Sequence, residues 1–248
     1  GYPDFGSEEY AQEIEEIRRI GGAENTALTT IERTADQEEL VFFWLVDDVD
    51  TERPPGQWLR IGQEVSVAEE QSLIDSARTL AQLGVAQANA GIIAWTGKWF
   101  PGDGQAPQPR PVSVINHIAG NDGSDLTIQD PDWRSFDDTP PFPDYVSGHA
   151  TFGGASYAVL ESIFGEDYEF STITQELDGV TRSFSSFEEA ARENTESRFF
   201  AGVHVRSAGI EGETAGFAAA QAILDTLAAP LTGEPTFGTL ATTPWILA

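Results

Sequence analysis

The side chains of this chain that could carry out chemistry fall into three short polar clusters. They are Lys98 with Arg110-Pro111, Ser147-Gly148-His149, and Ser197-Arg198 with His204. Arginine and lysine neutralise a tetrahedral oxyanion, while a serine hydroxyl and a glycine N–H at a helix N-terminus donate further hydrogen bonds to it. Of two imidazoles in such a pocket, one can attack phosphorus or ligate a metal centre while the other exchanges protons. The clusters therefore predict an oxyanion site, provided that the fold brings them together.

The composition limits the partners of such a site. The 248 residues include 13 Lys and Arg against 41 Asp and Glu, which gives a formal net charge of −28. This charge opposes binding to polyanions, so we expect no nucleic acid and no membrane as partner, and a pocket for an anion must be locally basic. Lys98 is the one lysine of the sequence, and the excess of carboxylates favours adaptation to high salt.

The sequence contains no Cys and no Met. Disulfides, thiolate catalysis and cysteine-based metal sites are therefore excluded. No run approaches the roughly 18 apolar residues that cross a bilayer. The sequence opens at Gly1 without an initiator methionine, and we expect a secreted or periplasmic protein whose signal peptide is not present in this sequence.

Apolar spacing and capping residues predict a mainly helical chain that positions the three clusters. We expect helices after Ser7 (ending at Gly21), after Thr34, over 54–65, after a Ser66-Glu69 capping box as far as Lys98, and over 110–118, 147–164, 186–199 and 205–228. The Pro- and Gly-rich stretch 100–145 predicts loops, and 168–184 a short hairpin. The predicted fold class is all-α, a single-domain helical bundle over residues 1–248 with long loops and at most a short hairpin.

The three clusters also occur in a recognisable order. The set Lys98…Arg110-Pro111, Ser147-Gly148-His149 and Ser197-Arg198-x5-His204 resembles the signature shared by vanadium-dependent haloperoxidases and the type 2 phosphatidic acid phosphatase superfamily. The motifs Trp95-x-x-Lys98 and Thr139-Pro-Pro-Phe142-Pro-x-Tyr145, with the stretches 147–154 and 182–187, look like bacterial haloperoxidases. The resemblance implies a bundle of the vanadium haloperoxidase and acid phosphatase type. It further implies oxidation of halide by hydrogen peroxide to a hypohalous acid equivalent at a His-bound vanadate.

The resemblance also implies a role for each site residue. Vanadate would be held by His204 on the metal and by Lys98, Arg110, Ser147, Gly148 and Arg198 on the oxygens. The remaining roles would fall to His149 as the acid–base residue, to Lys98 as the group that polarises the oxidant, and to Trp95 and Phe142 as the halide pocket. For these two aromatic residues, core packing is the competing interpretation. Phosphate or sulfate would fit the vanadate site, a small organic acceptor would be a further partner, and association into a homodimer is left open.

Two other functions remain open at this point. A soluble acid phosphatase would use the same pocket, with a phosphohistidine intermediate at His204 and with His149 protonating the leaving group. A non-catalytic relative would bind an oxyanion without turnover.

Departures from the family pattern bear on both readings. Residues 99–109 form an eleven-residue segment that is longer than its counterpart in the family and could displace the flanking cations. Val146 replaces the proline usual before Ser-Gly-His. Ala208 stands four residues after His204, where an aspartate is usual, and Glu211 is the nearest substitute. Loss of a group that orients a metal ligand costs about 10- to 100-fold in affinity or activity.

Other polar residues have simpler interpretations. We expect the third histidine, His117, to be structural. The acidic clusters, Asp47 with Asp48, Asp50 and Glu52, and Asp130 with Asp132, Asp137 and Asp138, could bind calcium, but neither matches a known loop, and solvated surface is favoured.

Overall fold

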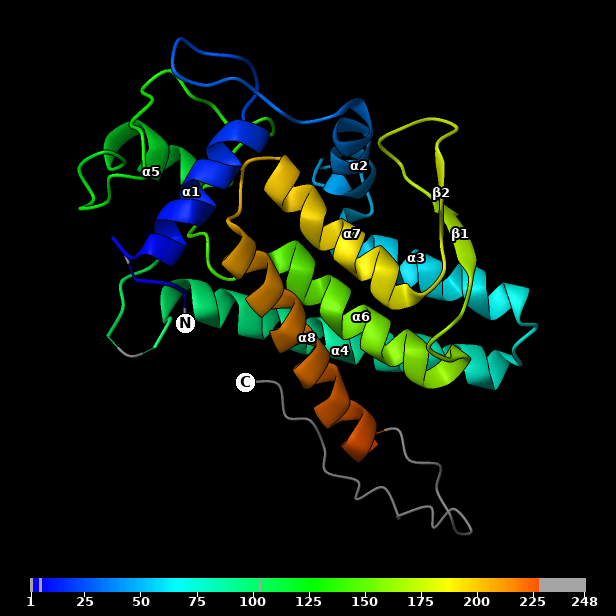
Figure 1. Ribbon diagram of the computed structural model, residues 1–248. Coiled ribbons are helices and arrows are strands. Elements are labelled where there is room, and N and C mark those ends of the chain that lie inside the picture. The colour runs from blue at the N-terminus through cyan, green and yellow to red at the C-terminus, as the bar shows by residue number, and fades with distance from the viewer. Residues whose placement is uncertain (1, 5, 103, 228–248) are drawn as a thin grey trace, which may run out of the picture.

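The structure is a computed structural model that describes residues 2–4, 6–102 and 104–227 (Figure 1). Its elements are α1 (Glu8–Ile20), α2 (Ala35–Leu45), α3 (Arg53–Ala68), α4 (Leu73–Trp99), α5 (Pro111–His117), α6 (Gly148–Phe164), β1 (Phe170–Ile173), β2 (Thr181–Phe184), α7 (Phe187–Phe200) and α8 (Arg206–Leu227). The predicted all-α class with one short hairpin is confirmed. Residues 228–248, including the predicted helix end at Ala228, lie outside the described residues, so the domain boundary of 1–248 stays a prediction.

The long helices pack around α6, which contacts α3, α4, α7 and α8. Glycines let α6 and α8 approach backbone to backbone. A Cβ at Gly154 would lie 2.0 Å from Glu213 O, and one at Gly216 would lie 2.0 Å from Thr151 O. The two helices begin side by side, since Ser147 N–H donates to Ala208 O at 2.8 Å. This contact brings two of the three polar clusters to one end of the bundle.

Helix boundaries follow the capping signals in most places. Ser7, Ser147 and Ser186 each accept a hydrogen bond from the backbone N–H three residues later, and Thr34 forms a reciprocal capping box with Gln37. Helix α1 ends at Ile20 with Gly21 as its C-cap, as predicted. Local sequence therefore determines where these helices start and stop.

The predicted capping box at Ser66 and Glu69 is wrong. Ser66 lies inside α3, where its hydroxyl donates to Gly62 O at 2.7 Å. The long helix α4 begins later, after Ser72, whose side chain accepts from the backbone of Asp75. A serine hydroxyl can bond back to the carbonyl four residues earlier in its own helix, so the motif alone does not mark a helix start.

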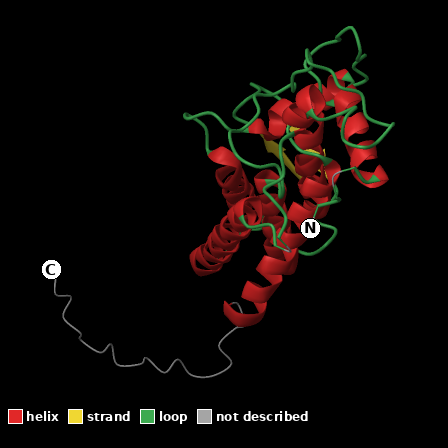
Figure 2. Cartoon of the chain, turned by 90° about the vertical axis from the view of Figure 1, so that its left-hand side faces the viewer, coloured by secondary structure: helices red, strands yellow, loops and turns green. Residues whose placement is uncertain are grey.

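The core is rich in tryptophan, and the loops gather at one end. Trp44, Trp58 and Trp133 are fully buried, and Trp44 stacks on Trp58 with ring centroids 5.5 Å apart. The antiparallel strands β1 and β2 pair from Phe170 opposite Phe184 onwards and pack beside α7. Figure 2 shows long loops over the end of the bundle that carries α1 and α5. None of the described helices combines the length and the apolar character that a membrane crossing requires.

Candidate functional site

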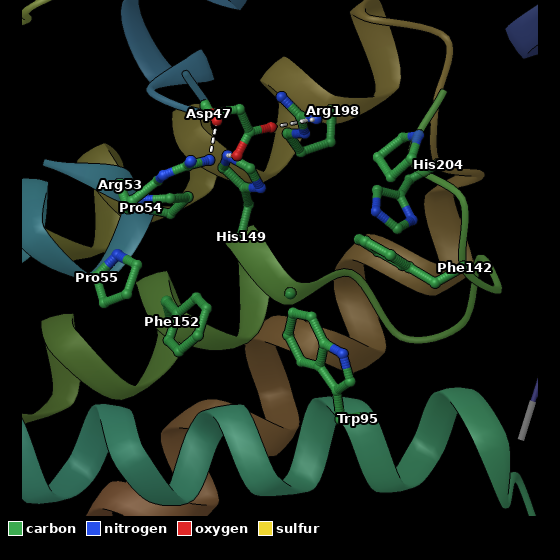
Figure 3. A pocket seen from close by; sticks show the side chains of 12 residues that line it. Asp47, Arg53, Pro54, Pro55, Trp95, Phe142, His149, Phe152, Arg198 and His204 are labelled. Atoms are coloured by element: carbon green, nitrogen blue, oxygen red, sulfur yellow. Dashed lines mark hydrogen bonds and ion pairs between the residues drawn. The ribbon is translucent and has the colours of Figure 1, made fainter. Parts of the chain in front are cut away.

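A cavity of about 280 Å³ lies where α4 ends, where α6 begins and where α7 leads into α8 (Figure 3). Its wall contains six of the predicted site residues, namely Trp95, Phe142, Gly148, His149, Arg198 and His204. The other three, Lys98, Arg110 and Ser147, are buried beside it. Because a water molecule takes about 30 Å³, the cavity has room for an oxyanion and a second small ligand.

His204 presents a lone pair toward the cations of the site. Its Nδ1 lies against the carboxylate of Asp144, and Arg110 Nη1 is 3.1 Å from its Nε2. The Asp144 carboxylate is an acceptor, so the proton resides on Nδ1 and Nε2 keeps its lone pair. Arg110 Nη1 also lies 3.5 Å from Nδ1, so it sits beside the ring and is not aligned with that lone pair. Burial, and then the charge of Arg110, lowers the pKa of His204 well below its usual value. The imidazole is therefore neutral with an unprotonated Nε2, the form that ligates metals or attacks phosphorus.

Arg110 and Arg198 carry buried N–H groups that lack acceptors. Arg110 donates to two backbone carbonyls at 2.6 and 2.7 Å, but its Nη2 finds no partner among the described residues. Arg198 Nη2 lies 3.5 Å from the carboxylates of Asp47 and Asp137, while its Nε and Nη1 also find no partner there. An unmade hydrogen bond of a buried donor costs about 1–3 kcal/mol, and more when the donor is charged. These three nitrogen atoms therefore mark a place for an anion.

His149 is a second neutral imidazole with the opposite tautomer. Its Nε2 lies 3.0 Å from Leu45 O and 3.8 Å from a carboxylate oxygen of Asp47. A carbonyl can only accept, so the proton resides on Nε2, and Nδ1 is left to accept one. Burial, and then the charge of Arg198, lowers the pKa of His149 to about 4. His149 can therefore act as a base across the neutral range.

Ser147 and Gly148 form the start of α6 at the cavity. Ser147 is the N-cap of the helix, and Gly148 is its first residue. The N–H groups of a first helical turn have no carbonyl acceptor within their helix and form the positive end of its dipole, which suits an anion. A Cβ at Gly148 would lie 3.2 Å from the Trp95 ring, so glycine keeps this approach open.

Lys98 does not line the cavity. Its Nζ donates to Pro143 O at 3.0 Å, to Asp144 O at 3.0 Å and to Val146 O at 2.6 Å. An ammonium group has three protons, and these carbonyls take all of them. Burial, and then Arg110, lowers the pKa of Lys98. To bind an oxyanion, Nζ would have to leave one of these carbonyls.

Trp95 and Phe142 form an aromatic wall of the cavity. Their ring centroids are 5.5 Å apart, and Trp95 keeps 42% of its surface exposed, so this pair is not core packing. Arg110 and Lys98 stand 4.9 and 5.0 Å from the Phe142 ring centroid, a distance at which cation–π attraction operates.

Sequence reasoning missed two carboxylates of the site. Asp144 is the unassigned position of the motif that ends at Tyr145, and it is completely buried against His204. A single carboxylate in a Pro- and aromatic-rich segment directly before Ser-Gly-His is the signal that could have revealed it. Asp47 was assigned to an acidic cluster, yet it lines the cavity between His149 and Arg198.

The departures from the family pattern have visible consequences. Near the end of the long segment 99–109, Gln108 O accepts from Asp144 N–H at 2.9 Å. Arg110 remains beside His204 and is not displaced. Ala208 is buried, Glu211 is exposed, and the carboxylate that bonds the histidine comes from Asp144 instead.

The remaining candidates lie elsewhere. His117 is exposed at the end of α5 and is not part of the cavity wall. Asp130 accepts from the hydroxyls of Thr26 and Thr29, at 2.6 and 2.5 Å. Within the described residues, no three His, Asp or Glu side chains are grouped so as to hold a metal ion.

Comparisons with known proteins find relatives of this chain. The family model described as the VCPO second helical-bundle domain matches residues 78–233. A vanadium chloroperoxidase from Curvularia inaequalis is 29% identical over 250 residues, which cover 80% of this chain and 40% of that protein.

Solved structures show the same fold. A bacterial vanadium-dependent iodoperoxidase matches with a TM-score of 0.74 and 24% identity over 91% of this chain and 51% of its own. A holo-type bacterial vanadium-dependent chloroperoxidase matches with a TM-score of 0.58 and 17% identity over 86% of this chain and 48% of its own. The chain thus spans about half the length of these solved relatives and less of the curated one.

Proposed function

The chain belongs to the vanadium haloperoxidase family, and from this premise we propose that it is a vanadium-dependent haloperoxidase that oxidises halide with hydrogen peroxide to a hypohalous acid equivalent. One observation carries the proposal. His204, with a lone pair on Nε2, and Arg198 line one cavity with Arg110 buried beside it, and three buried N–H-bearing nitrogens of these two arginines have no acceptor among the described residues.

This donor set fits vanadate. A tetrahedral oxyanion with one nitrogen ligand needs one imidazole and several cationic donors, and no cluster of carboxylates. His204 would bind the metal, while Arg110, Arg198 and the Gly148 N–H would bind oxygens. When bound, vanadate supplies a Lewis-acid centre that stays at vanadium(V) and activates hydrogen peroxide.

Other residues around the cavity would bind the oxyanion, transfer a proton or supply positive charge. Arg110 Nη1 lies 3.1 Å from Nε2 and its Nη2 has no acceptor among the described residues, so in the loaded protein the guanidinium would donate to oxyanion oxygens. His149 would accept a proton from hydrogen peroxide at Nδ1, since its Nε2–H is held by Leu45 O. Lys98, predicted to bind oxygens directly, adds positive charge behind the Phe142 ring.

The aromatic wall suits the halide side of the reaction. Trp95 and Phe142 form an apolar surface, and a weakly hydrated anion gives up little hydration free energy when it binds there. Arg198, across the cavity, provides the opposite charge. A small organic acceptor would approach past the same wall. A secreted or periplasmic location and association into a homodimer stay predictions.

Reconstitution with orthovanadate tests the proposal. The purified protein should halogenate a dimedone-type reporter with hydrogen peroxide and chloride, bromide or iodide, and only when vanadate is present. A phosphatase assay with a chromogenic phosphomonoester runs beside it. Ester hydrolysis that vanadate inhibits, without halogenation, would place the chain with the acid phosphatases. Oxyanion binding with neither activity would leave a non-catalytic relative.

A further inference from the structure

We infer that Asp144 is a positioning residue that fixes the tautomer and the direction of His204. The inference rests on the proposed function, in which Nε2 of His204 binds an oxyanion. The helix that follows His204 does not supply such a group itself, because Ala208, four residues after His204 in the first turn of α8, has no polar side chain.

Both carboxylate oxygens of Asp144 hold the start of α8. Oδ1 lies against Nδ1 of His204, and Oδ2 accepts from the backbone N–H of Val205 at 3.3 Å. The carboxylate thereby contacts both the imidazole and the backbone next to it. These two contacts restrict rotation of the ring. Asp144 has no exposed surface, so water cannot take over either contact.

The backbone of Asp144 is held just as firmly. Its N–H donates to Gln108 O at 2.9 Å, and its carbonyl accepts from Lys98 Nζ at 3.0 Å. Gln108 belongs to the long segment 99–109, and it is itself buried. Hydrogen bonds from Gln108 and Lys98 therefore fix the backbone of the loop that carries the carboxylate. The positive charge of Lys98 also offsets the negative charge of that carboxylate.

The chemical consequence concerns the proton of His204. With a carboxylate on Nδ1, the proton stays there and Nε2 keeps its lone pair. Without the carboxylate, the Nε2–H tautomer becomes accessible, and in this form Nε2 cannot ligate a metal. Loss of Asp144 should therefore weaken oxyanion binding without altering any residue that touches the anion.

Two variants and one control test this inference in vanadate-free protein. Asp144→Asn keeps the volume, but it turns one of the two accepting oxygens into an NH2 donor, which faces either the imidazole or Val205 N–H. Asp144→Ala removes the group. Glu211→Gln on the exposed face of α8 is the matched control. Nitrogen-15 NMR of the histidine rings and calorimetric titration with orthovanadate and with inorganic phosphate are the readouts, with circular dichroism to check folding.

In the wild type we expect opposite tautomers, Nδ1–H at His204 and Nε2–H at His149. Both Asp144 variants should shift His204 toward Nε2–H and bind both anions about 10- to 100-fold more weakly, whereas Glu211→Gln should match the wild type. A wild-type His204 with its proton on Nε2 would overturn the inference whether or not the variants fold. A folded Asp144→Asn with wild-type tautomer and affinity would also overturn it. None of these readouts needs turnover, so a failed haloperoxidase assay is a separate outcome.

Discussion

Removing the guanidinium of Arg198 should abolish most of the affinity for oxyanions while sparing the fold. In Arg198→Met the apolar stem of the buried side chain is kept, and two nitrogens without acceptors among the described residues, Nε and Nη1, are lost. The same helix provides a matched control in Arg192→Met, because Arg192 is exposed and pairs only with Glu188 in the described ion pairs.

The structure sets the size of this effect. Each hydrogen bond from a charged donor contributes about 1.5–3 kcal/mol, so two of them amount to roughly 3–6 kcal/mol. At about 1.4 kcal/mol per factor of ten, phosphate or vanadate should bind about 10²- to 10⁴-fold more weakly. Without an anion, the substitution should change the free energy of unfolding little. It removes two buried donors that have no acceptor in the described part of the chain, which stabilises the protein, and this gain offsets the loss of the ion pairs to Asp47 and Asp137.

Calorimetry and thermal unfolding with and without phosphate measure both parts. A ligand that binds the native state raises Tm, and this rise should be present in the wild type and in Arg192→Met but lost in Arg198→Met. An Arg198→Met protein that binds phosphate as tightly as the wild type would refute the assignment of the unpaired N–H groups to an anion site.

Three further predictions concern the base, the packing and the surface charge. Because burial lowers the pKa of His149 to about 4, its ring should stay neutral down to about that pH in a nitrogen-15 NMR titration, and a His149 titration near pH 6.5 would contradict this. His149→Ala should lower kcat/KM about 10²- to 10⁴-fold. Gly154→Ala should lower the free energy of unfolding by about 3 kcal/mol or more, because its Cβ would lie 2.0 Å from Glu213 O. Gly84 faces open space in α4, so Gly84→Ala should be neutral or stabilising, and denaturant melts measure both variants. With a net charge of −28, Tm should rise as salt screens carboxylate repulsion, and a flat Tm from low to molar salt would exclude the halophilic interpretation.

The sequence predicts those parts of the molecule that depend on near neighbours along the chain. Helix starts at Ser7, Thr34, Ser147 and Ser186 were predictable because an N-cap acts over three residues. Ser66 shows the limit, since the same hydroxyl can serve inside a helix.

Features of the site that depend on long-range contacts were not predictable. Asp144 meets a histidine 60 residues later, which no local pattern encodes. The spacing around Lys98 suggested an anion ligand, yet the folded loop gives its three protons to backbone carbonyls. Asp47 was one acidic residue among several until the end of α2 was placed beside His149. The clusters could be recognised from the sequence, but their tautomers and unpaired donors required the structure.

Vanadate-dependent halogenation by the wild type and by His204→Ala, assayed side by side, tests the central claim most directly. The structure predicts steady turnover in the wild type that requires added orthovanadate, and none in His204→Ala even at saturating vanadate, because the unprotonated Nε2 beside Arg110 has no replacement. Full halogenating activity in a folded His204→Ala protein would contradict the assignment of His204 as the vanadate ligand.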